Sequence, residues 1–269
     1  MAGVITADTD VVIEIGGFPI RLSTDDPAFM EMLKERYDGF VSSGKSARIE
    51  FDVVLANSDT MYGNGDLRVE RDGARWSMDR GDFQAHWNLR TARGTIRQTA
   101  NPYSLNSLLR IVHTLLLAEQ GGFLVHASSM VRNGRAFLFA GVSGAGKTTM
   151  ARLAPSDVTL LTDEISYVSR REDGYYAYGT PFAGDLGRLG KNMRAPLAGV
   201  YLLAKGTENK IEPVGAAEAG RALLENVLFF ARDSEMVRCV FEAACDFVGR
   251  VPVRRLTFTP DASVWEMIA

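Results

Sequence analysis

Residues 136–153 read AFLFAGVSGAGKTTMARL, and residues 141–148 within them match the pattern G-x-x-x-x-G-K-[ST] at every fixed position. The five residues before the match are apolar and predict a buried strand. The residues from 148 to 153 can form the helix that follows, and Pro155 would end it. A strand, a glycine-rich turn and a helix in this order are typical of a loop that holds phosphate groups with its backbone amides and the helix N-terminus.

The chemistry of such a loop assigns roles to its side chains. Lys147 would contact the β- and γ-phosphates of a nucleotide, and Thr148 would ligate Mg²⁺. The other residues expected around the phosphates are Gly141, Ser143, Gly144, Ala145, Gly146 and Thr149. A GTPase usually also carries an Asn-Lys-x-Asp motif, whereas residues 209–212 read NKIE and are interpreted as a surface turn, so the sequence favours ATP.

A histidine is expected beside this loop. Residues 123–131 (FLVHASSMV) predict a strand, and the Asn-Gly pair at 133–134 is the strongest short signal for a two-residue hairpin turn. Counting back along both strands from that turn places His126 opposite Gly141, at the mouth of the loop. The alternative is a core histidine bonded to a backbone partner. An antiparallel hairpin before the loop indicates an unusual branch of the phosphate-loop architecture, because a crossover helix usually precedes that strand.

Two acids follow the next predicted strand. Residues 158–162 (VTLLT) end directly at Asp163 and Glu164. A right-handed crossover would lay this strand beside the phosphate-loop strand and both acids next to the phosphates. One acid can hold Mg²⁺ while the other accepts the proton of an attacking hydroxyl. Since consecutive strand residues point to opposite faces, joint action requires a bulge or a strand end there. The alternative is a pair of exposed loop acids.

Together these residues resemble the HPr kinase/phosphorylase family. The resemblance covers about residues 121–170 and is carried by residues 125–128 (VHAS), the hairpin, the loop GVSGAGKT and residues 161–164 (LTDE). In that family a His-Gly pair precedes the phosphate loop and an Asp-Asp pair follows it, so the first Asp corresponds to Asp163. The family core is also similar to the catalytic domain of ATP-type phosphoenolpyruvate carboxykinases.

The resemblance implies an ATP- and Mg²⁺-dependent kinase that transfers the γ-phosphate to a serine or threonine hydroxyl of a protein or peptide. The expected catalytic residues are Asp163, His126 and Lys147, with Asp163 as the base. The expected metal ligands are Thr148, Glu164 and Asp163. Related kinases occur in bacterial gene clusters that make peptides or polysaccharides, and family members often form rings, so a homo-oligomer is allowed. Two alternatives stay open, a nucleotide-dependent binding module or switch without kinase activity and a small-molecule kinase.

The remaining sequence predicts two domains. Residues 1–100 read mostly as strands and predict a β-rich α+β domain, with one helix beginning at Asp26-Pro27. Residues 101–269 predict an α/β domain built on a phosphate-loop core of the HPr kinase/phosphoenolpyruvate carboxykinase type. A polar loop is expected after the acid pair. Other expected elements are helices near 104–120, 216–231, 234–248 and 264–268, and strands near 197–204 and 253–258.

A glycine-rich stretch, residues 179–194 (GTPFAGDLGRLGKNMR), contains Arg188, Lys191 and Arg194. It predicts either a mobile loop that brings cations to the phosphates or to an acidic substrate, or a solvated surface loop. His86 and His113 have no partner cluster in the sequence and are interpreted as structural.

Composition narrows the class of protein. Among 269 residues, 46% are hydrophobic and 23% charged, with a net charge of −3, which excludes a disordered or fibrous chain. Scattered Lys and Arg give no reason to expect a nucleic-acid partner. Two cysteines exclude a disulfide scaffold and favour a reducing compartment. The sequence shows neither the roughly 18-residue apolar run of a membrane helix nor a secretory signal, so we expect no membrane partner and a cytoplasmic location.

Overall fold

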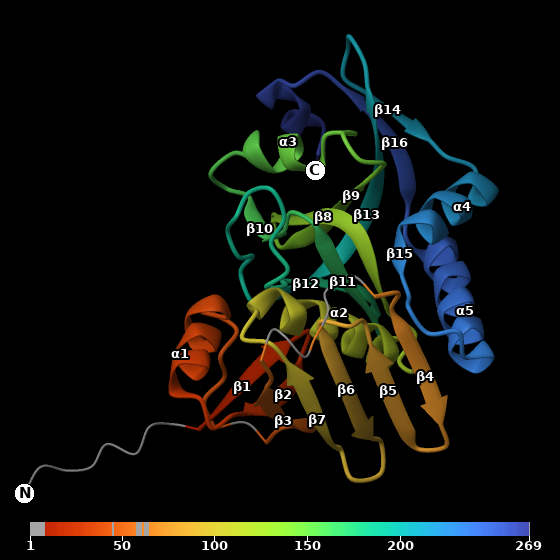
Figure 1. Cartoon of the computed structure of the whole chain (residues 1–269). Coiled ribbons are helices and arrows are strands. Elements are labelled where there is room, and N and C mark those ends of the chain that lie inside the picture. The colour runs from red at the N-terminus through yellow and green to blue at the C-terminus, as the bar shows by residue number, and fades with distance from the viewer. Residues whose placement is uncertain (1–8, 45, 58–60, 62–64, 269) are drawn as a thin grey trace, which may run out of the picture. The chain divides into compact units, whose positions relative to one another are not determined.

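The computed structural model describes residues 9–44, 46–57, 61 and 65–268 (Figure 1). Residues 1–8, for which the sequence predicts no secretory signal, lie outside the described residues. The chain divides into two compact units. Unit 1 is drawn from Met1–Val112 and Phe230–Asp233, and unit 2 from His113–Phe229 and Ser234–Ala269.

Both units combine strands and helices, which confirms the mixed α/β class expected from the sequence. The sequence places a division at Asn101-Pro102, and helix α2 (Pro102–Ala118) begins at that point. The contacts divide the chain further on, within α2 itself. No helix among the described residues is both long and apolar enough to cross a bilayer.

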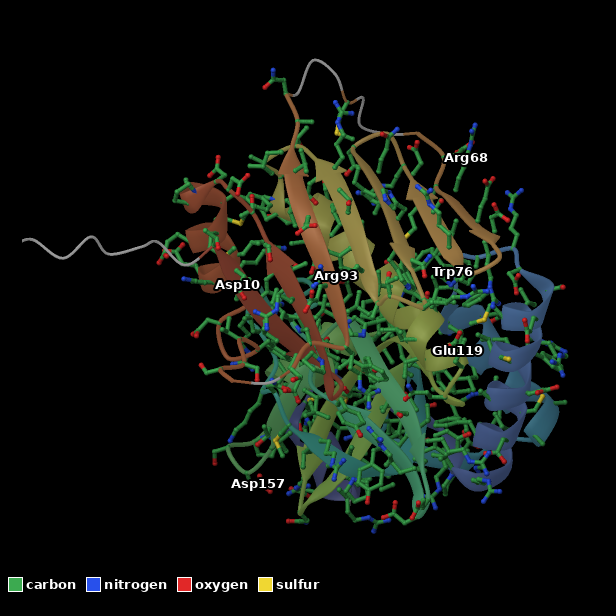
Figure 2. All side chains as sticks on the ribbon, turned by 90° about the horizontal axis from the view of Figure 1, so that it is seen from below. Asp10, Arg68, Trp76, Arg93, Glu119 and Asp157 are labelled. Atoms are coloured by element: carbon green, nitrogen blue, oxygen red, sulfur yellow. The ribbon has the colours of Figure 1, made fainter. Side chains whose placement is uncertain are left out.

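Unit 1 contains a seven-stranded sheet with the order β1-β2-β3-β7-β6-β5-β4, and Figure 2 labels Asp10 and Arg68 on its two outermost strands. These strands are β1 (Asp10–Ile15), β2 (Phe18–Ser23), β3 (Ile49–Leu55), β4 (Arg68–Asp72), β5 (Arg75–Asp79), β6 (Phe83–Asn88) and β7 (Arg93–Gln98). Helix α1 (Pro27–Arg36) begins as expected, because the Asp26 carboxylate accepts the Phe29 N–H at 2.8 Å.

Unit 2 is organised around strand β8 (Phe123–Arg132). Strands β10 (Thr159–Thr162) and β11 (Ile165–Arg171) pair antiparallel with one edge of β8, and the register shifts by one residue between Leu160 and Thr162. Strands β9 (Arg135–Ala140) and β15 (Val227–Leu228) pair with the other edge. The β8–β9 register confirms the predicted hairpin, since Ser128 lies opposite Phe139 and the turn residues Asn133 and Gly134 have φ of 52° and 72°.

The predicted neighbour of strand β10 is wrong. β10 pairs with β8 and not with the phosphate-loop strand β9. The physical reason is that β9 has no free edge, because β8 occupies one side and β13 (Arg194–Lys205) pairs in parallel with the other. A right-handed crossover therefore had no edge to return to.

The polar loop predicted after the acid pair is also wrong. Strands β11 and β12 (Gly174–Tyr178) form an antiparallel hairpin, and β12 pairs onward with β13. Because β13 also pairs with β9, the pairing runs from β8 through β9, β13, β12 and β11 back to β8 as a closed circuit. The surface turn predicted at 209–212 is instead an edge strand, β14 (Lys210–Pro213), paired with β16 (Val253–Phe258).

Strand β9 is buried on both faces, as its uninterrupted apolar sequence predicts. Ala136, Leu138 and Ala140 join a core that includes residues of α4 (Ala216–Asn226) and α5 (Ser234–Arg250). Phe137 and Phe139 join a second core with α3 (Lys147–Arg152) and the C-terminal 3₁₀ helix η2 (Ala262–Met267). The expected helix at 216–231 ends early because Val227 and Leu228 extend and pair with β8.

The type of hairpin turn gives a first prediction. Gly134 has a positive φ and a Cβ added there would meet nothing within 4 Å, so Gly134→Ala changes only backbone strain. We expect the free energy of unfolding to fall by about 1 kcal/mol. Gly220, which lies in α4 in equally open space, is the matched control. Gly220→Ala should raise stability by up to about 1 kcal/mol, and equal effects in urea unfolding would contradict the turn assignment.

A buried histidine gives a second prediction. His113 is fully buried in α2, its ring edge-on to Tyr167, and burial lowers its pKa to about 3. The folded protein keeps this ring neutral, whereas the unfolded chain takes up a proton below pH ~6.5. The free energy of unfolding should thus be unaffected by this group above that pH. Below it, the free energy of unfolding should fall by up to about 1.4 kcal/mol per pH unit towards pH 3. Urea unfolding at pH 7 and pH 5 should show a smaller loss for His113→Gln than for the wild type.

Candidate functional site

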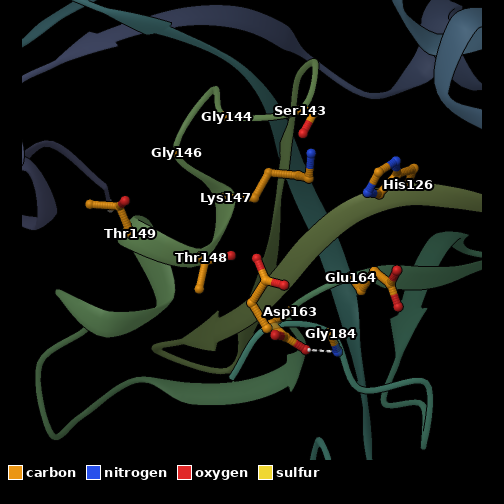
Figure 3. A pocket seen from close by; sticks show the side chains of 11 residues that line it. His126, Ser143, Gly144, Gly146, Lys147, Thr148, Thr149, Asp163, Glu164 and Gly184 are labelled. Carbon is orange, nitrogen blue, oxygen red and sulfur yellow. Dashed lines mark hydrogen bonds between the residues drawn. The ribbon is translucent and has the colours of Figure 1, made fainter. Parts of the chain in front are cut away.

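A cavity of about 410 Å³ lies in unit 2 where the glycine-rich loop after β9 approaches the end of β10 (Figure 3). This volume is in the range of small-ligand sites. The lining residues are His126, Ser143, Gly144, Gly146, Lys147, Thr148, Thr149, Asp163, Glu164, Gly184 and Asp185. Of the residues that the sequence predicts for the site, Gly141 and Ala145 do not line the cavity; Ala145 is buried in the core beneath the loop.

The loop needs glycine immediately before α3. Gly146 has a φ of 113°, and a Cβ there would lie 2.6 Å from the ring of Phe258 on β16. Both the backbone conformation and the close approach therefore exclude other residues. On the far side of α3, the indole N–H of Trp265 donates to the Met150 carbonyl at 3.2 Å, which holds the helix against η2. The loop is thus anchored through α3 to the C-terminal strand and helix.

Lys147 folds back into its own loop. Its Nζ donates to the Gly141 carbonyl at 2.8 Å, and the residue is only 9% exposed. Burial lowers the pKa of this ammonium below its ordinary value, while the carboxylates of Glu164 and Asp185 oppose the shift. Figure 3 shows Lys147 and Ser143 on one side of the cavity and the acid pair on the other. A buried cation thus faces the cavity with acids nearby.

The acid pair occupies a two-residue bend between β10 and β11. The Thr162 hydroxyl holds this bend by accepting the N–H groups of Glu164 and Ile165, each at 3.3 Å. The strand end that joint action of the acids requires is therefore present, and both acids line the cavity. Ile165 pairs with His126, so the bend lies beside this histidine. His126 also lines the cavity, as the register of the β8–β9 hairpin predicts.

The Asp163 carboxylate is already hydrogen-bonded. It is 3% exposed and accepts the Gly184 N–H and the Leu186 N–H, one on each oxygen and each at 2.8 Å. Gly184 fits closely over the acids, since a Cβ there would lie 2.9 Å from the Glu164 Cβ. Asp163 therefore fixes the segment 184–186 as a wall of the cavity, and each oxygen keeps a further lone pair for a ligand.

Comparison with known families covers this whole region. A model of the family described as "SynChlorMet cassette protein ScmC" matches residues 94–269, which is more than half of the chain and includes every residue lining the cavity. The chain belongs to the ScmC family. A search of the curated proteins finds no match.

In this ScmC-family chain the glycine-rich stretch 179–194 contributes an acid to the cavity, not a cation. Gly184 and Asp185 line it, and sequence reasoning assigned neither a role. The cations singled out in the sequence lie elsewhere, since Arg188 lines a different cavity and Arg194 begins β13 with its guanidinium over the Tyr176 ring. The sequence signal that could have indicated Asp185 is an acidic residue between Gly184 and Gly187.

The same ScmC stretch is attached to β10 at both ends. The Thr180 N–H donates to the Leu161 carbonyl at 3.1 Å, and the Lys191 N–H donates to the Leu160 carbonyl at 2.9 Å. With the two bonds to Asp163, the segment is held at its ends and its middle. These bonds fix which of its residues face the cavity.

The donor set of the cavity fits a nucleotide with Mg²⁺. Thr148, Glu164 and Asp185 offer hydroxyl and carboxylate oxygens, the hard ligands that Mg²⁺ prefers. Among the described residues, no three His, Cys, Asp or Glu side chains converge as a ready ligand group. Mg²⁺ commonly binds through one or two carboxylates together with substrate phosphates, so a partial set of this kind suffices.

The bonds from Asp163 predict how the segment 184–186 responds to mutation. Asp163→Asn keeps one acceptor oxygen and loses one charge-assisted bond, so hydrogen exchange at Gly184 or Leu186 should accelerate about tenfold or more. Glu164→Gln is the matched control, because Glu164 accepts neither amide. Hydrogen-exchange mass spectrometry that finds the same protection in both variants would contradict this role of Asp163.

Proposed function

We propose that unit 2 contains a phosphate-loop core of the HPr kinase and phosphoenolpyruvate carboxykinase type and that its cavity binds ATP. The motif G-x-x-x-x-G-K-T between β9 and α3 supports this assignment, as do the positive φ values of Gly144 and Gly146. The antiparallel β8–β9 hairpin before the loop supports the HPr kinase branch, in which the resemblance places His126 and the acid pair beside the phosphates.

The proposed reaction is transfer of the γ-phosphate of ATP to a serine or threonine hydroxyl of a peptide or protein. The observation that carries it is the convergence of Lys147 and the Asp163–Glu164 bend on one cavity. An anionic phosphate would draw the Lys147 ammonium from the Gly141 carbonyl, because a charge-assisted bond is stronger than one to a neutral acceptor. Mg²⁺ held by Thr148 and Glu164 would neutralise phosphate charge.

Asp163 has the geometry of an orienting base in this reaction. Its position is fixed by two backbone amides, and it can accept the acceptor hydroxyl proton with a remaining lone pair. The hydroxyl oxygen forms the new bond to phosphorus, the bond from phosphorus to the bridging oxygen breaks, and ADP leaves with that electron pair. Catalysis then rests mainly on positioning and charge.

The family description indicates which proteins to test first as phosphate acceptors. It calls ScmC a cassette protein, so the products encoded together with this chain are the first candidates. The assay combines the full chain, Mg²⁺ and γ-labelled ATP with those products, expressed separately. Transfer of label to a serine or threonine, located by mass spectrometry, is the expected result.

Variants assign the roles in that assay. Lys147→Met should weaken ATP binding and abolish transfer. Asp163→Asn should keep ATP binding within a few-fold and lower the transfer rate by about 10²–10⁴. Glu172→Gln, an exposed acid in the β11–β12 turn, is the matched control and should transfer normally. Normal transfer by Asp163→Asn would remove the base assignment, and ATP binding with no labelled acceptor would favour a nucleotide switch or a small-molecule kinase.

A further inference from the structure

A second cavity, of about 510 Å³, lies in unit 2 beside the C-terminal end of α3. Its walls come from α3, the connection from α3 to β10, and the segment 186–188. Its lining includes apolar residues, among them Met130, Ala151, Val158, Leu160 and Leu186, together with polar groups. None of these residues lines the first cavity, so the two cavities are formed by different residues.

Two arginines line this cavity from different elements. Arg152 is the last residue of α3, and Arg188 lies in the glycine-rich stretch. Both are exposed, and within the part of the chain that the structure describes neither guanidinium forms a hydrogen bond or an ion pair. Arg132 on β8 is a contrast, because it binds Asp157 and the carbonyls of Trp265 and Ile268. The cavity thus offers two cations that have no ion-pair partner among the described residues.

The two cavities share one wall. Gly184 and Asp185 line the first cavity, whereas Leu186 and Arg188 line the second. Asp163 holds this wall, with one oxygen bonded to Gly184 and the other to Leu186. A polypeptide with one residue in the first cavity therefore has only this short segment to pass before it reaches the second.

We propose that the second cavity binds the acceptor polypeptide through an apolar side chain flanked by a carboxylate. This inference rests on the proposed kinase function and adds its acceptor specificity. The apolar residues of the lining would take the side chain, and Arg152 and Arg188 would bind the carboxylate, which guanidinium groups do in a forked geometry. Because the chain as a whole carries a net charge of −3, attraction of an acidic segment depends on these local cations.

The length of α3 sets the spacing. Its six residues extend about 9 Å from the phosphate loop to Arg152, and an extended peptide covers that distance in about three residues. The acidic-apolar pair should therefore lie about three residues from the phosphorylated hydroxyl. This spacing distinguishes the inference from a general preference for acidic acceptors.

The test uses direct binding, so it does not depend on transfer. Fluorescein-labelled twelve-residue peptides carry one Ser and either Asp-Leu or Lys-Leu three residues away, and their anisotropy is titrated with the full chain. The wild type should bind the Asp-Leu peptide about tenfold more tightly than the Lys-Leu peptide. The double variant Arg152→Glu/Arg188→Glu should reverse that order, and Arg152→Lys/Arg188→Lys should keep it. Arg254→Glu, an exposed arginine on β16, is the control and should change nothing.

Several results would overturn the inference. Equal binding of both peptides, no binding of either, or insensitivity to the double charge reversal would each remove the second cavity as an acceptor site. Moving the Asp-Leu pair to eight residues from the Ser should leave the affinity of the peptide unchanged but should lower the rate of phosphate transfer. An unchanged transfer rate would contradict the proposed three-residue spacing. Failure of the kinase proposal would show separately, as absence of label transfer while the peptide preference persists.

Discussion

Backbone pairing of strand β8 along both edges is the constraint from which the candidate site follows. The edge shared with β9 sets where the glycine-rich loop begins, and the edge shared with β10 and β11 sets where the two acids lie. A slip of one residue on either edge would turn His126 or the acid bend away from the cavity. The Asn133-Gly134 turn fixes the first register, and the Thr162 hydroxyl supports the bend that interrupts the second.

The buried carboxylate of Asp163 adds a second constraint, which is separate from this strand pairing. A carboxylate removed from water is costly unless hydrogen bonds replace its solvation, and two backbone amides do so here. In return, the segment 184–186 has a defined position although it has no regular secondary structure. Asp163 thus combines a structural role, which the contacts establish, with the chemical role proposed for it. A mutation there affects both roles, which is why the experiments use the Asn variant, in which one acceptor oxygen remains.

Local signals in the sequence predicted much of this structure, and non-local pairing explains what they missed. The hairpin register followed from Asn133-Gly134, and the burial of β9 followed from five apolar residues. The partner of β10 could not be deduced, because it depends on β13, more than thirty residues later, occupying the far edge of β9. Strand Ile165–Arg171 lies where the sequence predicts a polar loop, because serine and arginine interrupt its apolar residues. Asp185 has no periodic context, and only its bonded neighbours Gly184 and Leu186 place it.

The wall held by Asp163 also has a thermodynamic consequence. Since residues of one short segment face both cavities, a ligand that shifts this segment on one side changes the surface offered on the other. By linkage, the factor by which the first ligand tightens or weakens binding of the second must equal the factor for the reverse order. A coupling energy of 1–3 kcal/mol is typical of such pairs. The size of the coupling between two ligands of this protein would then reflect a property of a single carboxylate and the two amides that it binds.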